Sequence, residues 1–309
     1  MTAAARSPEL TALFSKIRVG KPLAVGDITL VPLLLDSPGA DADLLEEGLA
    51  QGLTSLAEVS ETGSVNSVRV THSGVRMLLL VDGEQIVGAK QNRVVNASFL
   101  VPPGAAVNIP VSCVERGRWR YDAPGFAASG TTLTSSARIE KLKRVATSVV
   151  AKRGYDADQS AVWRDVDGYL ERTQVGSVTS AFADGYRSRS VDVESQLAEV
   201  TPVAGQIGLA AVRGDKLVAL DVLGSPDLYT RGWKKVARGM LAEVYDKAAP
   251  PVSDPAGVVA QALAAVAGAT VTRTSAPGCG ETLHGEAPGA VFGAVAYEGQ
   301  VYHAVVAPA

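Results

Sequence analysis

The sequence predicts an α+β protein: an antiparallel β-sandwich or open barrel in the N-terminal part, helices in the middle, and C-terminal hairpins packed with two helices. Three observations support this class. Short β-branched runs bounded by Gly, Pro, Asp and Asn dominate the first 120 residues. Between residues 135 and 200, apolar residues recur at the spacing of a helix, and strand-like runs return after residue 207. Strands grouped at the ends with helices between them are typical of an α+β fold.

In the N-terminal part we expect six strands and one helix. The helix covers residues 41–51, where leucines recur at helical spacing and Gly52 follows. Asp82-Gly83 predicts a hairpin turn, and Pro102-Pro103-Gly104 predicts a turn that ends one strand and starts another. The expected strands are residues 28–31, 68–70, 77–81, 85–87, 94–101 and 107–111.

The middle of the chain predicts amphipathic helices. The first begins near Ser135, with its apolar face on Ile139, Leu142 and Val149 and its basic residues, Arg138 and Lys141 among them, largely off that face. A second helix is capped by Asp158, and weaker helical patterns continue over residues 182–197.

The C-terminal part predicts hairpins and two helices. One hairpin joins residues 207–212 to 217–222, and a final one joins 291–297 to 301–306. Ser225-Pro226 opens a helix that runs to about Lys247, and Asp254-Pro255 opens another that ends near Gly268, because Ser and Asp cap helices well and Pro suits the first helical position. A strand is expected at residues 270–274.

Composition narrows the class of protein. The chain has 309 residues, 47% of them hydrophobic and 20% charged, which is typical of a globular protein. We expect a β-rich part at 1–130 and an α+β part at 131–309 that together form one compact unit. The net charge of −3 argues against dedicated nucleic-acid binding. The sequence does not fix the oligomeric state.

Cysteine usage and hydropathy predict the compartment. Two cysteines cannot form a disulfide framework, so we expect a reducing, cytoplasmic setting. The N-terminus lacks the apolar run of a signal peptide, and the longest apolar windows, residues 75–81 and 258–269, are shorter than the ~18 residues that a membrane span needs. We therefore expect no membrane association.

Several common site motifs are missing. The sequence contains no GxxxxGK[ST] loop, no GxGxxG after a strand and no GxSxG, which argues against P-loop, Rossmann and α/β-hydrolase chemistry. Residues of metal-ligating type occur near the C-terminus, but their spacing is unspecific, so no metal site is predicted. They are Cys279, Glu281, His284, Glu286 and His303.

The densest polar cluster lies among strands that otherwise consist of core residues. It comprises Asp82-Gly83-Glu84, the run Gly88-Ala89-Lys90-Gln91-Asn92-Arg93, and Asn96. In a strand, Lys90 and Asn92 would share one face and Gln91 and Arg93 the other, unless a bulge at Gly88 shifts the phase. A solvated edge strand explains such a pattern. Alternatively, amide, Lys and Arg side chains together bind phosphate or carboxylate oxygens.

A second cluster follows at residues 110–119. Cys113 and Glu115 would share one face of a strand, and we expect Cys113 to be a buried structural residue, as most strand cysteines are. Arg116, Arg118 and Arg120 around Trp119 could clamp an anion, or they could belong to a solvated turn.

These two runs, GAKQNR and PVSCVE, carry a family resemblance. Together with Gly117-Arg118-Trp119 and later segments, they resemble the ARG and rhodanese-phosphatase-superfamily-associated protein domain, a bacterial and archaeal family of unknown function. The match covers most of residues 20–309. The family name implies association with ADP-ribosylglycohydrolases and phosphatase-like proteins, and hence a link to ADP-ribose or NAD-derived metabolites.

The resemblance and the residues together give a functional hypothesis. We expect the protein to bind or process an anionic, nucleotide-like small molecule at the polar strand site. The alternative is a non-catalytic binding or scaffold module that acts through protein contacts. Neither hypothesis identifies a cofactor or decides whether the protein is an enzyme. The candidate catalytic residues are Glu84, Lys90 and Glu115, and the candidate ligand-binding residues are Gln91, Asn92, Arg93, Asn96 and Arg118.

Overall fold

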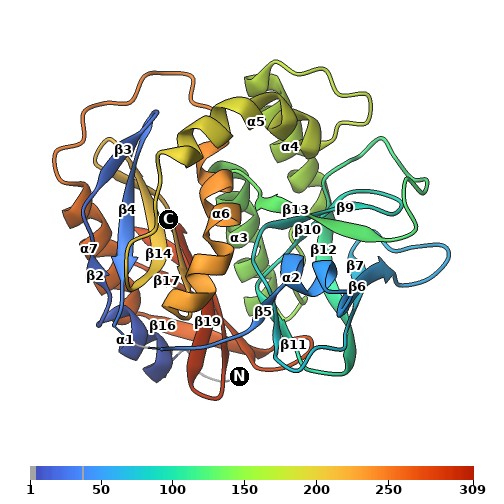
Figure 1. Cartoon of the computed structure of the whole chain (residues 1–309), viewed down its shortest axis with the longest axis horizontal. Helices are drawn as coiled ribbons and strands as arrows, with labels where there is room; N and C mark the ends of the chain where they lie inside the picture. The colour runs from blue at the N-terminus through green and yellow to red at the C-terminus, as the bar shows by residue number, and fades with distance from the viewer. Residues whose placement is uncertain (1–4, 37) are drawn as a thin grey trace.

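The computed structural model describes residues 5–36 and 38–309 (Figure 1). Its helices are α1 (Pro8–Phe14), α2 (Leu45–Ala50), α3 (Ser135–Val150), α4 (Gln159–Thr173), α5 (Phe182–Ala198), α6 (Pro226–Leu241) and α7 (Pro255–Ala267). Its N-terminal strands are β1 (Ala5–Arg6), β2 (Arg18–Val19), β3 (Leu23–Val25), β4 (Ile28–Leu34), β5 (Asp43–Leu44), β6 (Thr54–Glu58), β7 (Ser67–His72), β8 (Leu78–Leu80), β9 (Glu84–Gly88), β10 (Arg93–Val95), β11 (Phe99–Val101), β12 (Ala105–Cys113) and β13 (Phe126–Thr132). Its later strands are β14 (Gln206–Arg213), β15 (Lys216–Leu223), β16 (Thr270–Ser275), β17 (Glu281–Ala287), β18 (Ala290–Tyr297) and β19 (Gln300–Pro308).

A ten-stranded sheet forms one side of the molecule. Its order is β1-β16-β17-β18-β19-β15-β14-β4-β2, with β3 also paired to β4. Helices α1 and α7 cover one face, where Leu10, Phe14 and Leu263 pack against apolar side chains of the strands. Because β4 pairs with β14, this sheet takes strands from both of the parts that the sequence predicts.

The other strands form two smaller sheets. A six-stranded sheet has the order β13-β9-β10-β12-β7-β6, and a three-stranded sheet has the order β11-β8-β5. Figure 1 shows α3 and α6 between the large sheet and these strands, and α6 contacts both β14 and β13. Helix α6 buries Leu228, Trp233, Val236 and Met240 in the core that joins the two sides.

Side-chain caps fix where four helices begin. The side chains of Ser7, Asp158, Ser225 and Asp254 each accept a hydrogen bond from a backbone N–H in the first turn of α1, α4, α6 and α7. These caps satisfy backbone donors that have no partner within the helix.

Among the helices of the described residues, none is both long and apolar enough to cross a bilayer.

The α+β class and both C-terminal hairpins are confirmed, but several local predictions were wrong. The strand expected at residues 94–101 is two strands, β10 and β11, which belong to different sheets. Asp82-Gly83 is a turn but not a hairpin, because β8 and β9 pair with other strands. The helix expected at residues 41–51 is only α2, and the strands β6, β13 and β17 were not predicted.

Candidate functional site

The predicted polar run lies at the turn between β9 and β10, inside the six-stranded sheet. Strand β9 pairs with β13 on one side and β10 on the other, so the run does not form a solvated edge strand. Residues 89–92 connect the strands and therefore do not alternate between two sheet faces as expected. Gly88 has φ +113, and a Cβ there would lie 2.6 Å from the carbonyl oxygen of Gly125, so the turn requires glycine.

Asn92, Glu115 and Arg118 form a buried polar knot beneath this turn. Arg118 Nη2 lies 2.7 Å from Glu115 Oε2 and 3.2 Å from Asn92 Oδ1. The remaining donors of Arg118 go to Glu115 Oε1 and to the carbonyl oxygens of Gly88, Ala89 and Arg120. Burial alone would raise the pKa of Glu115, but hydrogen bonds from Arg118, the Asn92 N–H and Thr179 lower it below its usual range. Glu115 is therefore a fixed carboxylate that holds Arg118 in place.

Arg93 and Lys90 both lie near the Trp119 ring, but they differ in burial and in hydrogen-bond partners. Arg93 is fully buried, and its guanidinium donates to Gln91 Oε1 at 3.1 Å and lies 3.7 Å from Glu58 Oε1. Burial lowers the pKa of Arg93. Lys90 donates to the carbonyl oxygen of Glu61, and its amine lies 5.6 Å from the Trp119 ring centroid and 5.2 Å from that of Tyr121. Gln91 is buried beside Arg93, so neither residue is open to a ligand.

Glu84 belongs to a third group. Its Oε1 accepts from Lys235 of α6 at 2.6 Å, and its Oε2 accepts from the Val81 N–H at 2.9 Å. Lys235 also donates to Glu46 at 2.6 Å. Burial raises the pKa of Glu84 to about 6. The structure therefore brings Asn92, Glu115 and Arg118 together but separates the candidate catalytic residues Glu84, Lys90 and Glu115.

A buried ionic cluster, which sequence reasoning missed, joins α3 to both sides of the molecule. Arg138 donates to both carboxylate oxygens of Asp221 and to Asp82, and Lys141 donates to Asp82 and to the carbonyl oxygen of Asn96. Arg138 and Lys141 were wrongly expected off the buried face of α3, since both are at most 4% exposed. The sequence did contain one sign of this cluster. Asp221 is a single acidic residue within an apolar strand, and such a residue needs a buried partner.

Two further polar residues complete this cluster. Ionised Asp221 accepts from His303 Nε2 at 3.1 Å, and His303 Nδ1 lies 2.7 Å from Ser98 Oγ. Burial lowers the pKa of His303, so its neutral ring accepts from the Ser98 hydroxyl. Ser98 also accepts from the Asp82 N–H. All three side chains are enclosed, so this Ser-His-Asp chain has a structural role.

Cys113 is fully buried, as predicted. Its backbone N–H and carbonyl oxygen bond the side chain of Gln159 at 2.7 and 2.8 Å. Burial raises the pKa of the thiol. Cys113 is therefore an inert core residue that anchors the start of α4.

One pocket, with a volume of 420 Å³, is lined by three of the predicted residues, Asn92, Glu115 and Arg118. It also contains Asp122 and the ion pair of Asp184 with Arg187. Three carboxylates against two guanidiniums give the lining an excess of negative charge, and every guanidinium nitrogen of Arg118 already donates to the protein. This pocket is poorly suited to an anion.

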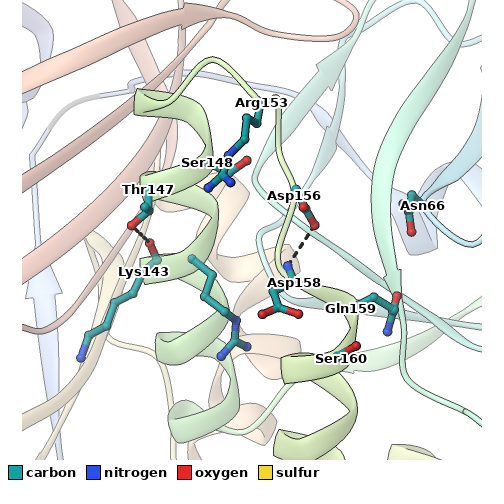
Figure 2. A pocket seen from close by; sticks show the side chains of 10 residues that line it. Asn66, Lys143, Thr147, Ser148, Arg153, Asp156, Asp158, Gln159 and Ser160 are labelled. Atoms are coloured by element: carbon teal, nitrogen blue, oxygen red, sulfur yellow. Dashed lines mark hydrogen bonds between the residues drawn. The ribbon is translucent and has the colours of Figure 1, made fainter.

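A larger cavity, the polar cleft, has a volume of 570 Å³ and lies between the C-terminal end of α3 and the start of α4 (Figure 2). A smaller pocket that contains Asn96 and Ser112 adjoins it and shares four of its lining residues. The residues that line the polar cleft are Asn66, Lys143, Arg144, Thr147, Ser148, Arg153, Asp156, Asp158, Gln159 and Ser160.

The basic residues of the polar cleft differ in how they are paired. Lys143 pairs with Glu140, and Arg144 pairs with Asp165 and donates to the carbonyl oxygen of Ala157. Within the described residues, Arg153 has no ion-pair partner. Ser148 is 3% exposed, and its hydroxyl has no hydrogen-bond partner within the same residues. In Figure 2, Arg153 and Ser148 lie at the end of α3, across from Asp156.

The residues of metal-ligating type near the C-terminus do not converge. Glu281 pairs with Arg273, Cys279 contacts Met77, and His303 bonds Asp221. Over residues 5–36 and 38–309, no three His, Cys, Asp or Glu side chains are grouped as they would be around a metal ion.

The fold and cavities define an α+β protein with a charged interior and an open polar cleft. The chain belongs to the family described as the ARG and Rhodanese-Phosphatase-superfamily-associated Protein domain, whose model matches residues 16–307. The resemblance carried by the GAKQNR and PVSCVE runs is thereby confirmed, and both runs lie at the buried polar knot. Comparisons with curated proteins and with solved structures give no match.

Proposed function

We propose that the protein binds a small anionic ligand of the nucleotide class, one that carries both phosphate and sugar hydroxyls, in the polar cleft. The observation that supports this most strongly is Arg153, a guanidinium without an ion-pair partner in the described part of the chain, in a 570 Å³ cavity. That volume lies within the ~300–1,000 Å³ range of small-molecule sites. An unpaired guanidinium matches phosphate oxygens in charge and geometry.

The start of α4 supplies further donors for a phosphate. Asp158 Oδ1 accepts from the Ala161 N–H, but the N–H groups of Gln159 and Ser160 have no partner among the described residues. Such first-turn amides carry partial positive charge and bind anions well. The buried hydroxyl of Ser148 adds a donor at the opposite wall.

The carboxylates of the cleft favour a ligand that also has hydroxyl groups. Asp156 accepts from the Asp158 N–H through one oxygen, and its other oxygen remains available. A carboxylate repels a bare phosphate but accepts hydrogen bonds from a ribose. The mixed lining therefore fits a sugar phosphate or nucleotide better than inorganic phosphate.

The family description supports the choice of test ligands. It associates the domain with ARG and rhodanese-phosphatase proteins, so ADP-ribose and other NAD-derived compounds are the first candidates. Because Glu84, Lys90 and Glu115 lie apart, this proposal concerns binding and assigns no reaction. The two free cysteines are compatible with a reducing cytoplasm.

Calorimetric titration tests the proposal. We expect ADP-ribose and AMP to bind the wild-type protein and adenosine to bind much more weakly, because it lacks the phosphate. Arg153→Ala removes one charge-assisted bond and should weaken AMP binding by roughly tenfold or more. Arg187→Ala is the matched control, because it removes an exposed arginine from the 420 Å³ pocket and should leave the affinity unchanged.

Two results would contradict the proposal. If neither phosphate ligand gives heat at millimolar concentration, the scaffold hypothesis is favoured. If Arg187→Ala weakens binding and Arg153→Ala does not, the ligand occupies the pocket of the polar knot instead.

A further inference from the structure

Another cavity, the histidine pocket, lies between the C-terminal end of α3 and the strands β16 and β17, and it shares the lining residue Thr147 with the polar cleft. Its volume is 460 Å³. Ala146, Thr147 and Val150 of α3 form one wall together with Ala151, which follows the helix. Thr272 and His284 are directly paired residues of neighbouring strands, so their side chains lie on the same face of the sheet. Together they form part of the opposite wall of the pocket.

His284 is the unusual residue in this pocket. It is 2% exposed, and neither ring nitrogen has a hydrogen-bond partner within the described residues. His72 and His303, the other two histidines of the chain, have partners on both nitrogens. A buried polar group without a partner costs stability, so native structures rarely retain one unless a water molecule or a ligand satisfies it.

We propose that the histidine pocket binds a small, uncharged aromatic ligand that carries one hydroxyl or ring N–H group and hydrogen-bonds to His284. This site is distinct from the polar cleft and does not depend on the function proposed there. The neutral imidazole offers one donor and one acceptor, which a phenolic hydroxyl can match in either direction.

The surroundings of His284 select against charged ligands. The α3 wall is apolar except for Thr147, whose hydroxyl already donates to the carbonyl oxygen of Lys143, and the side chain of Val150 is 62% exposed. Glu286 also lines the pocket and would repel an anion. Two charged groups act on the His284 ring, Asp82 and Lys141, and they pair with each other. An uncharged ring therefore enters without leaving a charge uncompensated.

Nitrogen-15 NMR of histidine-labelled protein tests this proposal with three probes: phenol, toluene and benzoate. The chain has three histidines, so His72 and His303 serve as internal controls. We expect phenol to shift the ring signals of His284 alone. Toluene should bind roughly three- to tenfold more weakly because it lacks the hydrogen bond, and benzoate should not bind.

Two variants separate binding from a loss of folding. Ala146→Leu fills the pocket from α3 without changing His284 and should abolish the phenol response. His284→Leu removes the polar group and should equalise the affinities for phenol and toluene measured by calorimetry. The proposal is overturned if phenol at its solubility limit leaves His284 unshifted, which would mean that the pocket holds only water. A response that survives in Ala146→Leu would overturn it equally.

Discussion

Arg138 donates two hydrogen bonds to Asp221, of 2.6 and 2.9 Å, and thereby joins α3 to β15 in the middle of the large sheet. The same guanidinium donates to Asp82, which precedes β9 in the six-stranded sheet. One arginine thus connects the two sides of the molecule. Burial alone would lower the pKa of Arg138, but the two carboxylates raise it.

Removing this arginine should destabilise the protein strongly. Arg138→Met leaves Asp221 and part of the charge of Asp82 buried without compensation, at a cost of about 3–5 kcal/mol. Urea unfolding followed by circular dichroism measures the loss. Arg18→Ala is the control, because Arg18 pairs with Asp36 at the surface and should change stability by less than about 0.5 kcal/mol. Equal effects of the two substitutions would contradict the role given to Arg138.

The polar knot is tested with a substitution that keeps the positive charge of Arg118. Arg118→Lys preserves the positive charge but cannot reach Glu115, Asn92 and three carbonyl oxygens together. We expect a loss of roughly 2–4 kcal/mol of unfolding free energy and faster hydrogen exchange in the turn at residues 89–92. Hydrogen exchange read by mass spectrometry locates the change. Unaltered exchange in this turn would mean that the knot does not hold it.

His284 should make the protein less stable in acid. Burial lowers its pKa from 6.5 to about 4. Between these pH values the unfolded chain binds a proton at His284 that the folded chain does not bind. The free energy of unfolding is therefore highest above pH 6.5 and decreases as the pH falls toward 4. The size of this decrease is roughly 3 kcal/mol. His284→Leu should flatten this part of the stability curve relative to wild type, and parallel curves would exclude the explanation.

The two thiols should react at very different rates. Cys113 is fully buried, and burial raises the pKa of both thiols, but Cys279 is partly exposed. Titration with a chromogenic disulfide reagent should label one thiol in the native protein and the second only on unfolding. Cys279→Ser should remove the native reaction. A rapid reaction of Cys113 in that variant would contradict its structural role.

Much of the local structure could be predicted because it depends on neighbouring residues. Ser225-Pro226 and Asp254-Pro255 start helices through caps that the chain carries next to the helix itself. The hairpin of β18 and β19 follows from two apolar runs around Glu298-Gly299. The burial of Cys113 follows from the apolar run that surrounds it.

The site could not be predicted in the same way, because its contacts join distant residues. Arg138 meets Asp221 across 83 positions of the chain, and the helical pattern of α3 gives no sign that a basic residue is paired in the core. The GAKQNR run was interpreted as a ligand-binding strand, but most of its polar groups bond to one another and to the backbone. Arg153 follows the end of α3 and appeared unremarkable, because only the folded chain places it in a cleft.

The structure of crystals grown with ADP-ribose tests the central claim most directly. The account predicts electron density in the polar cleft, with a phosphate within hydrogen-bond distance of the Arg153 guanidinium and a ribose hydroxyl near Asp156. Crystals of the Arg153→Ala variant grown under the same conditions should lack this density. Ligand density in the pocket of Asn92 and Arg118, with an empty polar cleft, would contradict the account.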